Sequence, residues 1–157
     1  MGTFKLATLI AATIAGTTPA GAQILTSSDP ELITELLRSE GYRAELIPAK
    51  GDDGPLIRSG AGGANFSIFF NDCTKGKECQ SVQFYAGFSK TKMDVAKMNE
   101  WNRDKRWGRA YIDKDGDPVI EMDINMAPGG MERALFVDSL NIWSKLIGEF
   151  RTRVFAD

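Results

Sequence analysis

Two runs of alternating apolar residues constrain the fold of this chain more than any other feature. They cover residues 65–70 and 80–88, and alternation with a period of two is typical of β-strands that bury one face. Because a short loop joins the runs, we expect an antiparallel hairpin at the middle of a sheet. The residues predicted to face the core are Phe66, Ile68, Phe70, Val82, Phe84, Ala86 and Phe88.

The loop of this hairpin contains the two cysteines of the chain. Cys73 and Cys79 have five residues between them, so they do not form a CxxC redox motif. With two thiols and no histidine, the chain cannot complete a zinc site. We predict a structural disulfide, with a redox-active pair as the alternative, and we expect no metal site and no cofactor.

A long amphipathic helix is predicted over residues 131–155. Its apolar residues recur at steps of three and four, which gives a stripe suited to lie across a sheet. Earlier helices are expected from Pro30 to just before Gly41, and through Trp101 to about Arg103 with Ser89 or Thr91 as the cap. The stripe of the last helix consists of Phe136, Leu140, Trp143, Ile147 and Phe150.

The remaining segments complete an α+β fold. We expect a brief extended segment at residues 44–47, a short strand at 56–59, and a hairpin of residues 109–113 and 118–125 with a type I′ turn at Asp115-Gly116. The prediction is one domain over residues 23–157, built on an antiparallel sheet of about five strands. The predicted order of helices and strands is α-β-β-β-α-β-β-α.

Residues 1–22 have the pattern of a secretory signal peptide. A single positive charge at Lys5 precedes an apolar run from Leu6 to Ala15, and the segment ends in Ala20-Gly21-Ala22. The run is well short of the ~20 apolar residues that span a bilayer. We therefore predict cleavage after Ala22, no stable membrane anchor, and a periplasmic or secreted protein.

Composition argues against several classes of function. The absence of histidine removes the commonest general base and transition-metal ligand. A formal net charge of −2 disfavours attraction of the whole molecule to nucleic acid, so we expect no nucleic-acid partner. Residues 90–109 nevertheless contain seven basic and three acidic side chains, whereas 113–123 contain five acidic and one basic. We expect these blocks to pair with each other, with a charged protein-binding face as the alternative.

The acidic block has two other chemical interpretations. Three aspartates alternate over residues 113–117 like the start of a calcium loop, but the glycine is misplaced and the twelfth position is Ile124 rather than glutamate. An exposed hairpin turn is the simpler interpretation. Glu121 and Asp123 share one face of a strand and could act as a hydrolase acid/base pair, although solvation or pairing with arginine is more common for such carboxylates.

The segment of residues 101–123 also contains the motifs of a known family. These are a Trp-Asn pair at 101–102, a basic-aromatic run at 106–111, an acidic turn at 113–117 and a strand at 120–123. Together with Gly129-Gly130 and Trp143, they resemble the YbjN-like family, described as putative bacterial sensory transduction regulators. The resemblance covers about residues 29–155. It implies a fold similar to that of type III secretion chaperones, with no known catalytic residues.

The function predicted from these features is non-enzymatic. We expect an exported protein-interaction module, chaperone-like or regulatory, that binds an extended protein or peptide segment as a homodimer. The alternatives are a small envelope hydrolase that uses Glu121 and Asp123, and an envelope structural protein. Trp101 and Trp107 flank the basic turn, where they either anchor a partner or cover the sheet edge. The predicted binding residues are Trp101, Arg103, Arg106, Trp107, Arg109 and Tyr111.

Overall fold

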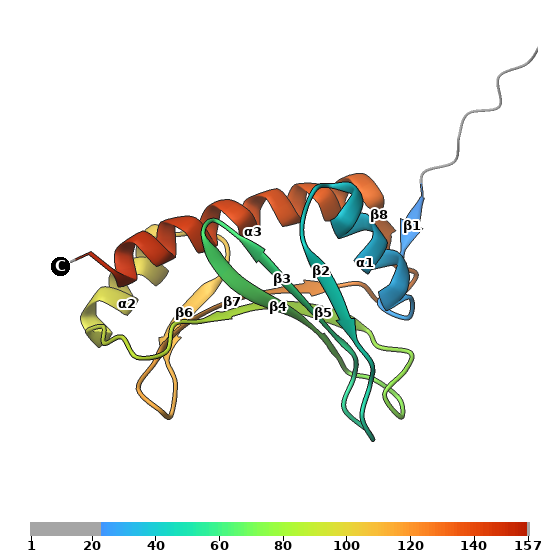
Figure 1. The fold of residues 1–157 in the computed structure, drawn as a ribbon, viewed down its shortest axis with the longest axis horizontal. Helices are drawn as coiled ribbons and strands as arrows, with labels where there is room; N and C mark the ends of the chain where they lie inside the picture. Colours follow the sequence, from blue (N-terminus) through green and yellow to red (C-terminus); the bar gives the residue numbers. More distant parts are fainter. Residues whose placement is uncertain (1–22, 157) are drawn as a thin grey trace, which may run out of the picture.

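A six-stranded antiparallel sheet with helices packed on one side forms the architecture of residues 23–156, the part of the chain that this computed structural model describes (Figure 1). The predicted signal peptide lies outside the described residues. The elements are β1 (Ile24–Leu25), α1 (Pro30–Ser39), β2 (Ala44–Ile47), β3 (Leu56–Ala61), β4 (Ala64–Asn71), β5 (Ser81–Gly87), α2 (Val95–Asp104), β6 (Arg109–Ile112), β7 (Pro118–Asn125), β8 (Met131–Glu132) and α3 (Arg133–Val154). The strand order of the main sheet is β2-β3-β4-β5-β7-β6, and β1 pairs with β8 separately.

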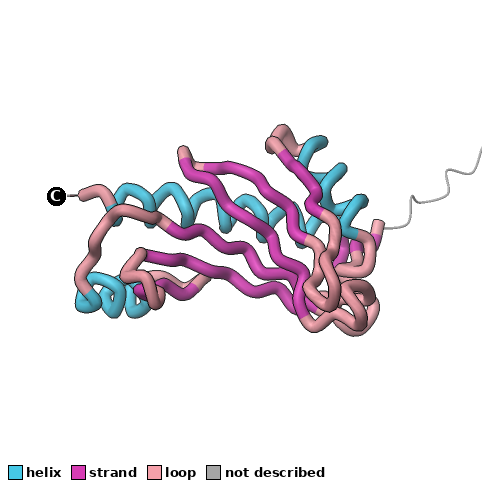
Figure 2. Tube along the Cα trace, turned by 60° about the horizontal axis from the view of Figure 1, so that its bottom comes forward, coloured by secondary structure: helices cyan, strands magenta, loops and turns pink. Residues whose placement is uncertain are grey.

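Helix α3 covers one face of the sheet. It lies across the strands in Figure 1, whereas the opposite face is turned toward the viewer in Figure 2 without a helix over it. We refer to this opposite side as the uncovered face. All five residues of the predicted apolar stripe of α3 are fully buried, which confirms that prediction. None of the helices within residues 23–156 combines the length and apolar character of a membrane span.

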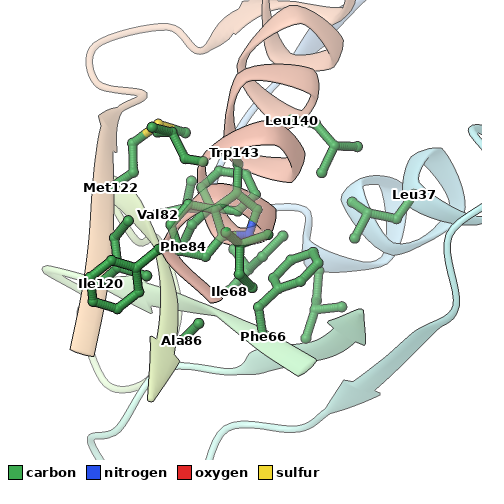
Figure 3. Packing of buried hydrophobic residues seen from close by; sticks show 14 of the residues in the cluster. Leu37, Phe66, Ile68, Val82, Phe84, Ala86, Ile120, Met122, Leu140 and Trp143 are labelled. Atoms are coloured by element: carbon green, nitrogen blue, oxygen red, sulfur yellow. The ribbon is translucent and has the colours of Figure 1, made fainter. Parts of the chain in front are cut away.

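The core lies between α3 and the two central strands. The ring of Trp143 has its centroid 5.8 Å from that of Phe66 and 5.5 Å from that of Phe84, as Figure 3 shows from close by. All seven strand residues predicted to face the core are buried. Since β4 and β5 are the third and fourth strands of six, the central antiparallel hairpin is confirmed.

The sheet has more strands than predicted. It contains six strands rather than about five, and four rather than three of them lie between α1 and α2. The brief extended segment at Ala44–Ile47 is a full strand, because all four of its residues pair with β3. A four-residue segment shows too little alternation to establish a strand from sequence. The α+β class and the antiparallel pairing are as predicted.

Two helix boundaries also differ from prediction. Helix α2 begins at Val95 and not after Ser89 or Thr91, because the Asp94 carboxylate accepts a hydrogen bond from the Ala96 N–H at 2.8 Å. Helix α3 begins at Arg133 rather than Met131, because Met131–Glu132 pair with the two residues of β1. Such pairing between distant short segments has no signal in the local sequence.

The turn between β6 and β7 is built on a side chain. A type I′ turn requires positive φ at both central residues, but of the pair Asp115-Gly116 only Gly116 has it, at +82°. The Asp113 carboxylate instead accepts hydrogen bonds from the N–H groups of Asp115 and Asp117, both at 2.9 Å. Within residues 23–156, no three His, Cys, Asp or Glu side chains come together as candidate metal ligands.

The loop between β4 and β5 is closed by a disulfide. The sulfur atoms of Cys73 and Cys79 are bonded, at a sequence separation of 6. On the chain-entropy model, closing so short a loop stabilises the folded state by only about 2 kcal/mol, because it removes few conformations from the unfolded chain. The bond therefore stabilises the loop of the central hairpin, while the core provides the main stabilisation of the domain.

The turn between β3 and β4 rests directly on α3. Gly62 has φ of +56°, and a Cβ atom at this position would lie 2.7 Å from the Cα of Gly148. A Cβ atom on Gly148 would meet its nearest neighbour, the Gly62 Cα, at an ordinary contact distance of 3.4 Å. A side chain at Gly62 would therefore clash with α3, whereas a Cβ atom at Gly148 fits.

We predict opposite effects for alanine at these two positions. Gly62→Ala should lower the free energy of unfolding by about 1–3 kcal/mol, because it adds both a clash and an unfavourable φ. Gly148→Ala should leave it unchanged or raise it by up to about 1 kcal/mol, because alanine favours the helix. Urea denaturation of both variants tests this. A Gly148→Ala variant as damaged as Gly62→Ala would contradict the contact.

Candidate functional site

The structure separates the six predicted binding residues into different environments. Trp101 is only 2% exposed and lies against Phe150 in the core, with ring centroids 5.0 Å apart. This burial corrects the prediction of Trp101 as a binding residue, because a side chain in the core cannot anchor a partner. Arg103 extends from α2 into solvent and pairs with its neighbour Asp104 at 2.8 Å.

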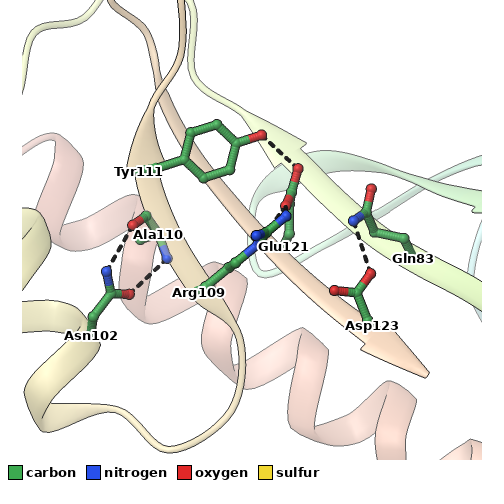
Figure 4. Close-up of polar contacts among 7 residues, drawn as sticks. All are labelled: Gln83, Asn102, Arg109, Ala110, Tyr111, Glu121 and Asp123. Carbon is green, nitrogen blue, oxygen red and sulfur yellow. Dashed lines mark hydrogen bonds and ion pairs between the residues drawn. The ribbon is translucent and has the colours of Figure 1, made fainter. Parts of the chain in front are cut away.

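Arg109 and Tyr111 come together around Glu121 on the uncovered face. Arg109 donates from Nε and Nη2 to Oε2 of Glu121, at 2.9 and 2.7 Å, and the Tyr111 hydroxyl donates to Oε1 at 2.6 Å (Figure 4). We refer to these three residues as the Glu121 cluster. Of the ion pairs found within residues 23–156, Arg109–Glu121 is the one that joins the basic and acidic blocks, so the predicted pairing of the blocks is observed for this pair alone.

The electrostatics of the Glu121 cluster favour a fixed arrangement. Burial, together with the hydrogen bond to Glu121, raises the pKa of the Tyr111 hydroxyl above its ordinary value. The hydrogen bond to Glu121 likewise raises the pKa of the Arg109 guanidinium. Tyr111 is therefore a neutral donor at neutral pH, and Arg109 is a charged one. With both of its oxygens hydrogen-bonded, Glu121 is held in place rather than poised to accept a substrate proton.

Asp123, the second carboxylate of the hydrolase alternative, also has a protein partner. Its Oδ1 accepts a hydrogen bond from Nε2 of Gln83, the residue directly opposite on β5, at 2.8 Å. Both carboxylates of this alternative are thus engaged by neighbouring side chains. The geometry gives a catalytic acid/base pair no support.

Asn102 holds the outer edge of β6. Its Nδ2 donates to the carbonyl oxygen of Ala110 at 2.9 Å, and its Oδ1 accepts from the Ala110 N–H at 2.8 Å (Figure 4). This side chain takes the place of a neighbouring strand at that position, which blunts an edge otherwise open to pairing. It also fixes the end of α2, and so sets the path of the loop that carries Arg106 and Trp107.

Of the two tryptophans among the predicted binding residues, Trp107 is the one that is accessible. Trp107 is 49% exposed, and the Arg106 guanidinium carbon lies 5.3 Å from the centroid of its ring. Beside it is a hollow of about 270 Å³ between the loop and α3, which we refer to as the Trp107 hollow. It is lined by Asp104, Lys105, Arg106, Trp107, Ile142, Lys145, Leu146 and Glu149.

Sequence reasoning missed the contribution of α3 to this hollow. Ile142 and Leu146 supply its apolar part, and Lys105 Nζ pairs with Glu149 Oε2 across the two elements at 2.6 Å. Leu135, Ile142 and Leu146 follow one another at steps of seven and four. This second apolar stripe, beside the main one, is the signal that could have pointed to the helix surface.

Residues 29–156 match the family model YbjN, described as "Putative bacterial sensory transduction regulator". The chain belongs to the YbjN family. Three of the YbjN motif residues have structural roles here, because Trp101 fills the core, Asn102 caps the edge of β6 and Glu121 joins β6 to β7. No curated protein matches the chain. No solved structure matches it either, so the expected likeness to type III secretion chaperones stays a prediction.

The Glu121 cluster yields a prediction about stability. Arg109→Met leaves a buried carboxylate with Tyr111 as its side-chain donor, and should lower the free energy of unfolding by about 1–2 kcal/mol, a modest figure because Arg109 itself is exposed. Arg109→Met/Glu121→Met removes both charges and should cost less than the single change. Chemical denaturation measures both. A double variant that loses as much free energy of unfolding as Arg109→Met, or more, would contradict the account.

Proposed function

We propose that this YbjN-family protein is a non-enzymatic regulator that binds an extended segment of a partner protein at the Trp107 hollow. The observation that carries the proposal is the half-exposed indole of Trp107 beside an open hollow with an apolar lining from α3. Tryptophan and arginine dominate the energetic centres of protein interfaces, and here Arg106 lies against the Trp107 ring.

The lining of the hollow indicates the chemistry of the segment. Ile142 and Leu146 offer apolar surface for one inserted side chain. The charged side chains around them are three basic and two acidic, namely Lys105, Arg106, Lys145, Asp104 and Glu149. This balance favours a segment with an apolar or aromatic anchor and acidic residues beside it. If the bound segment is unfolded in the free partner, the proposed role is chaperone-like.

The proposal places the protein outside the cytoplasm, in the periplasm or the extracellular medium. It rests on the signal-peptide pattern of residues 1–22 and is supported by the Cys73–Cys79 bond, because disulfides persist in oxidising compartments. A non-enzymatic role is supported by the lack of histidine and by the engagement of Glu121 and Asp123. The homodimer expected from the sequence stays a prediction that light scattering on the folded chain tests.

Site-specific crosslinking tests the proposed segment binding. A photoreactive phenylalanine analogue at position 107 should capture a defined partner in the native envelope. The same group at position 95 should not, because Val95 is exposed on α2 and does not line the Trp107 hollow. Equal capture at both positions would show that the label reports chance encounters.

The captured partner then allows a quantitative test. Trp107→Ala should weaken its binding by about thirtyfold or more, as expected for truncation of an interface hot spot. The free energy of unfolding should change by no more than about 0.5 kcal/mol, since Trp107 is at the surface. Val95→Ala serves as the matched control and should leave affinity unchanged. Unaltered affinity in Trp107→Ala would remove the hollow as the binding site.

A further inference from the structure

The two central strands separate at one end of the sheet. β4 and β5 are paired from Asn71 and Ser81 to Ser67 and Tyr85, and the pairing stops there. Each strand continues on its other side, β4 with β3 as far as Ala64 and β5 with β7 as far as Gly87. Figure 2 shows the two strands diverging toward this end. The sheet is therefore open between β4 and β5 while both strands stay ordered.

Main-chain groups line this opening. Phe70 donates its N–H to the Pro55 carbonyl oxygen beside β3, so the alternate residues of β4 direct their main-chain groups toward β5. Ser67 uses these groups in its pair with Tyr85, which leaves those of Asn65 at the opening. Asn65 and Gly87 would form the next pair of the ladder, but that pair is absent from the register of the described strands. The opening thus presents the polar edges of two strands.

A hollow of about 430 Å³ lies at the opening, and we refer to it as the β4/β5 pocket. Its volume is in the range of small-molecule sites. Phe66 and Ala86, both buried, provide apolar lining. The polar lining comes from Arg43, Glu45, Arg58, Ser59, Asn65, Ser67 and Tyr85.

Arg43 is held in position over the pocket. Its Nη2 donates to Oδ1 of Asn65 at 2.7 Å and to the carbonyl oxygen of Ser59 at 3.4 Å. A Cβ atom on Gly60 would lie 3.1 Å from this nitrogen, so the missing side chain leaves room for Arg43 to cross β3. No hydrogen bond among residues 23–156 uses Nε or Nη1 of Arg43, which leaves three N–H donors for a ligand.

Arg58 adds a second cation to the pocket. It lies opposite Glu45 on β2 and Ser67 on β4, on the uncovered face. In the part of the chain that the structure describes, neither Arg58 nor Arg43 has a carboxylate oxygen within 4.0 Å. With Glu45 as the acidic side chain of the lining, two arginines give the pocket a surplus of one positive charge.

Tyr85 lies on the other side of the opening. A Cβ atom on Gly87 would be 3.1 Å from its hydroxyl oxygen, so this glycine lets the tyrosine lie along its own strand. Burial, and then the nearby carboxylates of Asp113, Glu121 and Asp117, raise the pKa of Tyr85. Its hydroxyl therefore stays neutral, and the uncharged tyrosine forms one wall of the pocket.

From these contacts we infer that the β4/β5 pocket binds an organic monocarboxylate with an apolar body. The carboxylate accepts hydrogen bonds from the N–H groups of Arg43 and Arg58, and the apolar body lies on Phe66, Ala86 and Tyr85. A single negative charge neutralises the surplus of one positive charge in the lining. A dianion such as phosphate would exceed this surplus and be repelled more strongly by Glu45. This site shares no lining residue with the Trp107 hollow, so the inference goes beyond the proposed function and does not depend on it.

The carboxylate can come from a free small acid or from the C-terminus of a peptide, and titration calorimetry distinguishes the two. The probes are phenylacetate and its neutral counterpart phenylacetamide, together with a short peptide ending in phenylalanine as the free acid or the amide. Each acid should bind the folded protein about tenfold or more tightly than its amide. Binding of phenylacetate assigns a small-molecule source, and binding of the peptide acid alone assigns a C-terminal source.

Variants link the affinity to the pocket. Arg43→Met and Arg58→Met should each weaken the acid by about tenfold or more, whereas Arg103→Met, an exposed arginine outside both sites, should not. The acid and amide comparison needs no variant, so it decides the matter even if a substitution impairs folding. The inference is overturned if neither acid binds, if acid and amide bind equally, or if folded Arg43 and Arg58 variants bind like the wild type.

Discussion

The packing of the apolar stripe of α3 against β4, β5 and β7 is the interaction on which the rest of the structure depends. Trp143 is at its centre, and Phe150 extends the contact to Trp101 of α2. The indole N–H groups of Trp101 and Trp143 are buried without a hydrogen-bond partner in the described chain. An unmet donor costs about 1–3 kcal/mol, whereas burying an aromatic side chain of this size stabilises by about 4–6 kcal/mol. Packing therefore outweighs hydrogen bonding at both positions.

This arrangement divides the conspicuous residues of the central segment between folding and recognition. Trp101, Asn102 and Glu121 hold α2, β6 and β7 together, so their distinctive chemistry is used within the protein. The accessible features lie outside the core. Trp107 lies beside α3 where the loop after α2 passes it, and the β4/β5 pocket lies where the sheet opens.

The central hairpin, α1, β7 and the stripe of α3 could be predicted because their signals are local and strong. Alternation places Phe66 and Phe84 on one face of their strands, and steps of three and four place Trp143 and Phe150 on one side of a helix. The burial of Trp101 could not be predicted, because α2 is mostly polar and its few apolar residues do not reveal which side meets Phe150. The pairing of β1 with β8 and the separation of β4 from β5 depend on contacts between distant segments, so they too have no local signal.

Quenching of tryptophan fluorescence by iodide tests the central claim most directly. The account predicts that, of the three tryptophans, Trp107 supplies the quenchable, red-shifted emission, because Trp101 and Trp143 are enclosed by α3 and the sheet. The Trp107→Phe variant should therefore show blue-shifted emission that iodide barely affects. Emission from Trp107→Phe that is quenched as strongly as that of the wild type would mean that Trp101 or Trp143 is open to solvent, and would contradict the packing described.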